Sequence, residues 1–464
     1  MTRCLLALSI ANVLLVTGVP AAVGGQSAVS GTSFSADLVT VPAEPIARQW
    51  TTIEVTVTGT VNGERVLVSE AQAVATISEG GEATQVYPLT AEEQDPLFRA
   101  EVVFPRPGTY LLRAEVTPAG RSAAIQTTFR VRVVEQSLPP RDQPLLVVVC
   151  AGARQVSLLD PVVGQTVASV AVPEPPACTF YDEQAQVLWL AFAGSGADEG
   201  AAPFAEALDL GDLSVRERVS LPFLPVSLVA DATRLFLTDE QRNRVTWVDR
   251  SRPEKTVTVE VGPGPRALAL LSGGNLLCVG NADLRNEDPY DSLSVIDLTK
   301  REEIIRLPVG THPLALLELP GADRLCVCAA GDNRVAVVDT QSWRCVSSVD
   351  TGGWPMALAW AGGDRAKLLC RNDRAVATLE LSTNTAGALL PLPATPDHLA
   401  VDRRPDGSAY VACADASLIV SLPNSGKGEM KTYFAGKHPV AVYYRQAAAG
   451  PAGPLPLHDG KERP

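Results

Sequence analysis

The chain has few of the residues on which common catalytic sites depend. Histidine occurs only four times in 464 residues, which leaves little for histidine-based metal sites or catalytic triads. The sequence holds no GxSxG, HExxH or P-loop motif, and it lacks the CxxCH and paired CxxC spacings of haem and zinc sites. We therefore predict no catalytic residues, no metal and no cofactor.

Positive charge and helical patterns are also scarce. Lys and Arg number 39 against 52 Asp and Glu, so the net charge is −13. Such a surface repels phosphate backbones and argues against nucleic-acid binding. The periodic segments are rich in Val, Thr and Leu, and 36 prolines and 36 glycines suit many tight turns. These features predict an all-β protein.

Only one long apolar run occurs, and it lies at the N-terminus. Arg3 precedes an apolar segment over Leu5–Val19, and small residues follow it. This pattern predicts a signal peptide over residues 1–25. An uncleaved membrane anchor is the alternative, although the run is short for a membrane span. No second run is long enough to cross a bilayer after cleavage, so we expect an exported protein that is periplasmic, at the cell surface or extracellular.

Eight cysteines follow this segment, at Cys150, Cys178, Cys278, Cys326, Cys328, Cys345, Cys370 and Cys413. Export favours disulfides, yet most of these cysteines lie within apolar strand patterns. Cys345 is expected two strands away from Cys326 and Cys328, about 10 Å at a strand spacing of ~4.8 Å, too far for a bridge. We interpret the cysteines as buried thiols that act as small hydrophobes, with a disulfide framework as the alternative.

Residues 34–135 alternate between apolar and polar side chains in short segments. Strands are predicted at 51–61, 73–78, 98–104, 109–116 and 127–134. About seven short strands in ~100 residues are typical of an immunoglobulin-like sandwich. The segment DPLFRAEVVFPRPGTYLLRAEV (95–116) resembles the corner of bacterial immunoglobulin-like and YtkA-like domains. The resemblance concerns the fold alone. We interpret the domain as a docking or spacer module, with a passive cap on the next domain as the alternative. Residues 136–144 are a proline-stiffened linker.

From residue 145 to 445 the chain repeats a pattern of four short strands, best seen over 308–350. A proline opens the first strand of each repeat, at Pro176, Pro225, Pro265, Pro313, Pro355, Pro396 and Pro439. The spacings of these anchor prolines lie between 40 and 49 residues, a period typical of β-propellers. We therefore predict a seven-bladed β-propeller. Residues 438–444 are expected to complete the blade that begins at 145–172, which closes the ring with one strand plus three.

Four segments carry a resemblance to a known repeat family: VGTHPLAL (309–316), VGPGPRALAL (261–270), DNRVAVVDT (332–340) and DSLSVIDLT (291–299). They resemble the repeats of the YVTN family of β-propellers. The resemblance covers about residues 145–445 and implies a propeller of the kind found in bacterial exported and surface-layer proteins. Residues 446–464 are rich in Ala, Gly and Pro and are expected to be a disordered tail.

Candidate binding residues flank the anchor prolines. The residue two positions after each anchor is small except at His398, which has Asp397 beside it. The neighbours of the other anchors add Arg266, His312, Trp354 and His438. These six residues are predicted to converge on the channel mouth, where they suit an anionic or polar ligand. The alternative for His398 is a residue that fills a gap and bonds to a backbone carbonyl.

Acidic residues recur at two kinds of position. One closes the third strand of six repeats, at Asp160, Asp209, Asp249, Asp297, Asp339 and Glu380. We predict that these accept hydrogen bonds from their own turns rather than form a metal ring. The loop at 280–291 carries Asp283, Glu287, Asp288 and Asp291, but its spacing fits no standard calcium loop, and we favour a solvated loop.

Two functions remain open. The first is an exported, non-catalytic scaffold that binds a protein or cell-envelope component. The second is an enzyme or ligand sensor at the channel mouth, because the resemblance extends to seven-bladed propellers that are lactonases or redox enzymes.

Overall fold

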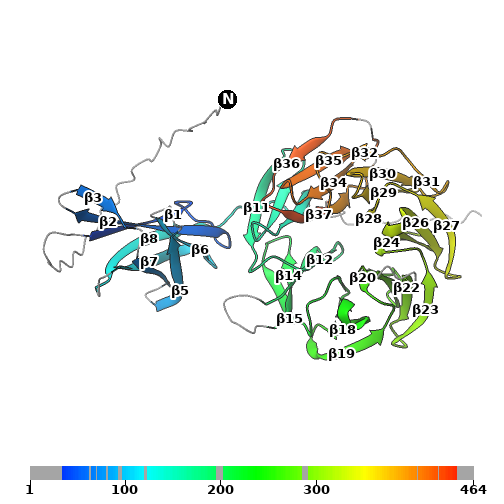
Figure 1. The fold of residues 1–464 in the computed structure, drawn as a ribbon, viewed down its shortest axis with the longest axis horizontal. Coiled ribbons are helices and arrows are strands. Elements are labelled where there is room, and N and C mark those ends of the chain that lie inside the picture. Colours follow the sequence, from blue (N-terminus) through cyan, green and yellow to red (C-terminus); the bar gives the residue numbers. More distant parts are fainter. Residues whose placement is uncertain are drawn as a thin grey trace, which may run out of the picture. The chain divides into compact units, whose positions relative to one another are not determined.

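The computed structural model of the chain describes residues 34–446, except 62–63, 69–70, 80–81, 92–96, 120–122, 195–201, 285–290, 405 and 427 (Figure 1). The predicted signal peptide and the predicted tail beyond residue 446 lie outside the described residues. The described part contains strands and two short 3₁₀ turns, but no α-helix. Within it, no helix has the length and apolar character needed to cross a bilayer. The prediction of an all-β protein is confirmed.

The chain divides into two compact units. The first holds most of strands β1–β8, which pair in the order β1-β2-β6-β5-β4-β7-β8, with β3 on β2. The strands are β1 Phe34–Val41, β2 Trp50–Val61, β3 Glu64–Leu67, β4 Ala71–Glu79, β5 Glu82–Ala91, β6 Leu97–Val103, β7 Gly108–Pro118 and β8 Ile125–Val133. The alternating apolar residues of the sequence are the buried residues of the strands. In β7, for example, Tyr110, Leu112 and Ala114 face the core.

The second unit contains everything from Val134 onward, with Ile46–Trp50 and Val103–Pro107. It is a ring of seven sheets, which we call blades 1–7 (Figure 1). Blade 1 comprises β9 Leu145–Cys150, β10 Gln155–Asp160, β11 Gln165–Ala171 and β37 Pro439–Arg445. Blade 2 comprises β12 Cys178–Asp182, β13 Val187–Phe192, β14 Phe204–Asp209 and β15 Val215–Ser220. Blade 3 comprises β16 Leu228–Ala230, β17 Arg234–Asp239, β18 Arg244–Asp249 and β19 Arg252–Glu260, with the 3₁₀ turn η1 Glu240–Arg242.

The remaining blades follow the same order. Blade 4 comprises β20 Pro265–Leu270, β21 Leu276–Asn281, β22 Ser292–Asp297 and β23 Glu302–Pro308. Blade 5 comprises β24 Pro313–Leu319, β25 Arg324–Ala329, β26 Arg334–Asp339 and β27 Arg344–Asp350, with η2 Ala330–Asp332. Blade 6 comprises β28 Pro355–Trp360, β29 Arg365–Cys370, β30 Ala375–Glu380, β31 Thr385–Ala386 and β32 Leu390–Pro391. Blade 7 comprises β33 His398–Val401, β34 Ser408–Cys413, β35 Leu418–Pro423 and β36 Lys431–Tyr433.

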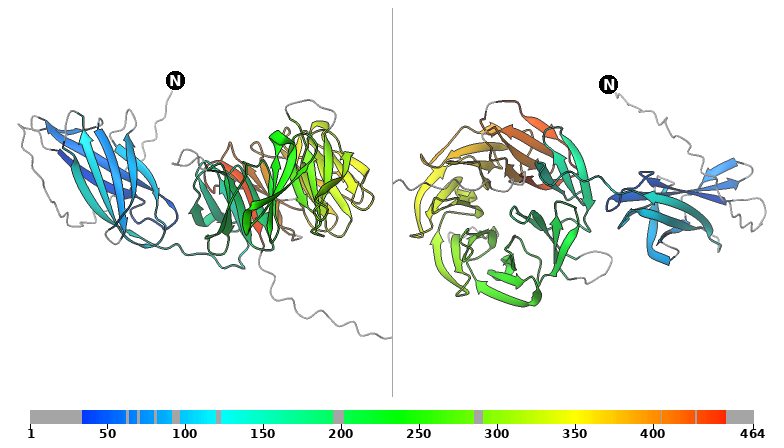
Figure 2. Two further views of the ribbon diagram at one scale, coloured as in Figure 1. Left: turned by 90° about the horizontal axis from the view of Figure 1, so that it is seen from below. Right: turned by 180° about the vertical axis from the view of Figure 1, so that it is seen from behind.

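The ring closes as predicted. Strand β37 pairs with β9, so that Pro439 lies opposite Cys150 and Tyr444 opposite Leu146. Figure 2 shows this C-terminal strand, in orange-red, against the blue-green strands of blade 1. Blade 1 is therefore built from both ends of the repeat region, and its inner edge is covered rather than left free. The predictions of seven blades and of one-plus-three closure are confirmed.

Packing between blades explains why the second strands read as unbroken apolar runs. The side chains of β9 (LLVVVC) and β13 (VLWLAF) are buried on both faces, because each strand is sandwiched between two neighbouring blades. The fourth strands lie at the outside and expose most of their residues, as in β19. Each buried Val or Leu contributes about 1.5–3 kcal/mol.

The eight cysteines of the described residues are free thiols, and six are buried. Cys178 is half-buried and Cys345 is exposed, so the interpretation as buried hydrophobes fails for Cys345. The reason is its strand: β27 is the outer strand of blade 5, and most of its side chains face water.

The five aspartates that close third strands cap their own turns, as predicted, whereas no turn N–H group bonds to the Glu380 carboxylate among the described residues. Asp249 accepts hydrogen bonds from the backbone N–H groups of Ser251 and Arg252, at 2.9 and 3.2 Å. Asp297 accepts from Thr299 and Lys300, both at 2.9 Å. The Ser251 hydroxyl on Asp249 and the Lys300 N–H on Asp297 are the main causes that lower the pKa of these two carboxyls.

Candidate functional site

The residues that flank the anchor prolines gather at one end of the ring. First strands are innermost in each blade (Figure 1). Because all blades repeat one strand order, these strands all start at the same end of the ring. We call the residues immediately before and after the anchor prolines the anchor rim. Four rim residues that directly precede a proline have left-handed backbones, with φ of 64, 54, 55 and 53° at Gly264, His312, Trp354 and His438.

The backbone of these four residues connects neighbouring blades. Each N–H group donates to a side chain of the preceding blade. The bonds are Gly264 to Asn243 Oδ1 at 3.0 Å, His312 to Asp291 Oδ2 at 2.6 Å, Trp354 to Asn333 Oδ1 at 2.8 Å and His438 to Ser417 Oγ at 3.1 Å. Their carbonyl groups accept from Ala282, Ala330, Arg371 and Ala151 in their own blades, at 2.7–3.1 Å. At each junction the left-handed residue thus has both its N–H group and its carbonyl group hydrogen-bonded.

Sequence reasoning missed these acceptor side chains. Asn243 and Asn333 both have left-handed backbones and directly precede a third strand, so the Asn-Arg-Val pattern was a usable signal. Asp291 lies in the predicted acidic loop, but it is 6% exposed and its oxygens accept from Asp283 and His312. It therefore holds the next blade instead of facing solvent. Glu287 and Asp288 lie outside the described residues.

Two charged rim residues are bound in ion pairs between blades. Arg266 Nη2 donates to Glu240 Oε1 of blade 3 at 2.8 Å. Asp397 Oδ1 accepts from Arg371 Nη1 of blade 6 at 2.7 Å, and its Oδ2 accepts from the Ala414 N–H at 2.8 Å. Both side chains thus stabilise blade junctions.

Only His312 and Trp354 contact each other through their side chains among the six predicted residues. Their ring centroids lie 5.4 Å apart at an interplanar angle of 42°. The His312 Nδ1 atom is buried and has no hydrogen-bond partner among the described residues. A Cβ at Gly331 would lie 2.7 Å from this atom, so glycine there makes room for the imidazole. His438, by contrast, is exposed.

His398 lies in a separate aromatic cluster formed by the first strands of blades 7, 1 and 2. It packs edge-on against Tyr443, with ring centroids 4.9 Å apart. Tyr443 Oη shares a 2.6 Å hydrogen bond with Thr179 Oγ1, and its ring lies 5.7 Å from that of Tyr181. The sequence singled out His398 but missed these three partners, because only the closure of the ring brings them to it.

The cluster keeps His398 neutral. Its Nδ1 accepts a hydrogen bond from the backbone N–H of Val442 at 3.4 Å, which places the proton of the neutral ring on Nε2. Burial lowers the pKa of His398 to about 4, even though the Val442 bond and Asp397 act in the opposite direction. The predicted bond to a backbone carbonyl is replaced by one from an N–H group. No group of three His, Cys, Asp or Glu residues suited to a metal occurs in the described part of the chain.

Comparisons with known proteins define the fold but not a family. No protein family and no curated protein matches the sequence. Among solved structures, hydrazine synthase of Kuenenia stuttgartiensis is similar over 63% of this chain and 98% of its own, at 13% identity and a TM-score of 0.51.

Candidate 6-phosphogluconolactonases of Bacteroides uniformis and Bacteroides fragilis both give a TM-score of 0.52, at 12% and 13% identity. The matches cover 65% and 66% of this chain and 99% of each relative. Identities this low show a shared architecture alone. The repeat region of this chain is thus a seven-bladed β-propeller.

Proposed function

We propose that the protein is an exported, non-catalytic propeller of the YVTN repeat type whose anchor rim binds a protein or cell-envelope partner. In this proposal residues 34–135 form an immunoglobulin-like spacer that carries the propeller, and residues 136–144 link the two. The observation that carries the proposal is the engagement of the charged rim residues in contacts between blades.

Catalysis by acid and base requires a titratable group within reach of the proton it transfers. Arg266 and Asp397 instead hold Glu240, Arg371 and the Ala414 N–H at 2.7–2.8 Å. Of the other predicted residues, His312 packs against Trp354, His438 is exposed, and His398 lies in a separate aromatic cluster. Such a rim supports recognition better than bond making.

The rim residues with left-handed backbones support the proposal of a binding surface. A left-handed backbone costs a residue other than glycine roughly 1–2 kcal/mol. Blade 4 has glycine at this position, whereas blades 5, 6 and 1 have His312, Trp354 and His438. A rim that served architecture alone would favour glycine at all four, so the aromatic and imidazole side chains point to a role at the surface.

The test is capture of a partner from a cell-envelope extract with the full chain immobilised. We expect the wild-type protein to retain a partner and Trp354→Gly to lose it, since glycine keeps the left-handed turn and removes only the side chain. Trp343→Gly is the matched control, because Trp343 also has a left-handed backbone, at φ 53°, but follows the third strand of blade 5 at the other end. Capture by none of the proteins, or equal capture by both variants, contradicts the proposal.

One observation favours the second function, an enzyme or ligand sensor. The Tyr181 hydroxyl is buried without a hydrogen-bond partner among the described residues, and it belongs to the cluster around His398. The solved structures with similar folds include candidate lactonases. Hydrolysis of 6-phosphogluconolactone that His398→Ala abolishes would replace the binding proposal with this one. We expect no turnover above the uncatalysed rate.

A further inference from the structure

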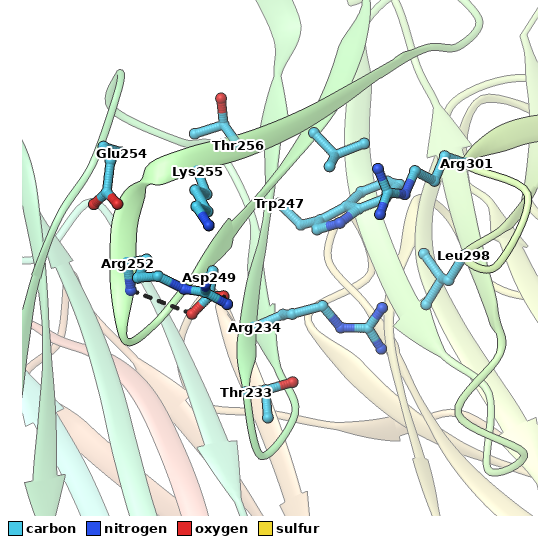
Figure 3. A pocket seen from close by; sticks show the side chains of 11 residues that line it. Thr233, Arg234, Trp247, Asp249, Arg252, Glu254, Lys255, Thr256, Leu298 and Arg301 are labelled. Carbon is cyan, nitrogen blue, oxygen red and sulfur yellow. Dashed lines mark hydrogen bonds and ion pairs between the residues drawn. The ribbon is translucent and has the colours of Figure 1, made fainter.

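A second concave surface lies between blades 3 and 4, away from the anchor rim. It is a cleft of about 610 Å³, lined by residues of β17, β18, β19 and the turn after β22 (Figure 3). Arg234 at the cleft starts β17, whereas Glu240 at the rim follows the end of that strand. A strand of six residues spans about 20 Å, so the cleft and the rim lie at opposite ends of the blade.

The cleft is lined by four cations, Arg234, Arg252, Lys255 and Arg301, and by two carboxylates, Asp249 and Glu254. Arg234 is paired with Asp231 at 2.6 Å, and Arg252 with Asp249 at 3.1 Å. Lys255 and Arg301 are exposed and have no ion pair or side-chain hydrogen bond within the described part of the chain. In Figure 3 these two side chains lie on either side of Trp247. Two cations that form no ion pair among the described residues therefore line one concavity, together with one carboxylate, Glu254.

The turn that carries Arg301 differs from blade to blade. Arg301 has a left-handed backbone, with φ 62°, in the turn after the third strand. The same turn position holds Gly164 in blade 1, Leu213 in blade 2, Trp343 in blade 5 and Asn384 in blade 6, all at positive φ. Of these five blades only blade 4 has a cation at this position.

The outer strand of blade 3 also differs from that of blade 5. In blade 3 Asp249 pairs with Arg252 and Val248 with Thr256, so Lys255 belongs to a three-residue insertion without register partners. Blade 5 has no such insertion: Arg344 pairs with Asp339, as Arg252 pairs with Asp249. Arg344 is exposed on an outer strand and does not line the cleft, so it serves as a control cation.

We propose that the cleft between blades 3 and 4 binds a small organic anion with two or more negative charges, held between Lys255 and Arg301. The volume lies within the range of about 300–1,000 Å³ that is usual for small-molecule sites. Arg301 offers a planar set of donors to a carboxylate or phosphate, and Lys255 offers a point charge.

The charge of the whole protein favours a small anion over an acidic polymer. Electrostatic screening acts over about 8–10 Å at physiological salt, so a small anion responds mainly to the cations of the cleft. A long polyanion would also meet the rest of a molecule whose net charge is −13.

The test is isothermal titration calorimetry of the full chain at low ionic strength with citrate, inorganic phosphate and acetate as separate probes. We expect citrate to bind, phosphate to bind more weakly, and acetate not to bind measurably. Loss of one charge-assisted contact should weaken citrate binding about ten- to a hundredfold. Lys255→Ala and Arg301→Gly should each show this loss, and added salt should reduce the wild-type affinity.

Arg301→Gly is chosen because glycine occupies the same turn in blade 1, at φ 76°, so the fold should tolerate it. Arg344→Ala is the control and should bind citrate like the wild-type protein. Three results would overturn the proposal: absence of citrate binding, unchanged binding in the Lys255→Ala/Arg301→Gly double variant, or an equal loss in Arg344→Ala. Tighter binding of polyglutamate than of citrate would overturn the choice of a small anion.

Discussion

At the scale of single residues, the same position in the repeat has different roles in different blades. The residue two positions after the anchor is small in most blades because it lies on the inner strand, but in blade 7 it is His398. Tyr443 of the closing strand packs against this imidazole, and the Val442 N–H donates to it. A neutral His398 is therefore part of the folded structure.

His398 should make stability depend on pH in a definite window. Its pKa is about 4 in the folded protein against 6.5 for an ordinary histidine. The unfolded chain binds this proton first as the pH falls, so the stability contribution should decline from about pH 6.5 to 4 and stay constant below. His398→Phe should reduce the dependence of the melting temperature on pH over this window. Thermal unfolding at a series of pH values measures this dependence.

The exposed His438 supplies the control for this experiment, since His438→Gln should keep the wild-type slope. The turn acids Asp249 and Asp297 have lowered pKa values, so their contribution to stability is lost at the acid end of this window and beyond it. Comparison of the wild-type protein with His398→Phe removes this shared contribution. Equal slopes in the wild-type protein and His398→Phe would contradict the assignment.

At the scale of elements, strand β37 is secured by more than its pairing with β9. Its last residue, Arg445, is 1% exposed. Arg445 Nη1 donates to the Leu210 carbonyl at 2.7 Å, and Nη2 donates to the carbonyls of Pro140 and Gln143 at 2.9 and 3.1 Å. The segment predicted as a linker, 136–144, thus supplies two acceptors for the closing strand.

Arg445→Ala should destabilise the protein by roughly 3–5 kcal/mol, because it leaves three carbonyl groups unpaired and a cavity behind. Arg344→Ala, an exposed arginine on an outer strand, should change stability by less than about 0.5 kcal/mol. Chemical denaturation of both variants measures the difference. A small effect at Arg445 would show that water can replace its three contacts.

At the scale of the whole molecule, the ring depends on the meeting of two distant segments. Strand β9 carries the buried sequence LLVVVC and pairs with β10 on one edge and β37 on the other. Without β37, an apolar strand would present a free edge, which is a template for association with other chains.

Deletion of residues 439–464 should therefore cause aggregation and loss of a cooperative unfolding transition. Deletion of residues 447–464 alone, which lie within the predicted disordered tail (446–464), should leave the melting temperature unchanged. Size-exclusion chromatography and calorimetry of the two truncated proteins test this pair of outcomes. A monomeric, cooperatively folded protein without β37 would show that six complete blades suffice.

The sequence alone determined the architecture, because each of its signals is local. Anchor prolines, turn acids and apolar runs act within a few residues, and their period in the forties repeats a four-stranded unit. The closing strand predicted at 438–444 differs from β37 by only one residue at each end. The ends of the repeat region also determined how the ring closes.

Only the tertiary structure decided which side chains meet. His398 contacts Tyr443 because blades 7 and 1 adjoin, and Lys255 and Arg301 line one cleft because blades 3 and 4 adjoin. Asp291, in a predicted solvated loop, holds the backbone of His312 in the next blade. Such contacts depend on the register of the strands in two neighbouring blades. The repeat in the sequence determines the length of a blade, but it does not determine which side chains of adjoining blades lie opposite each other.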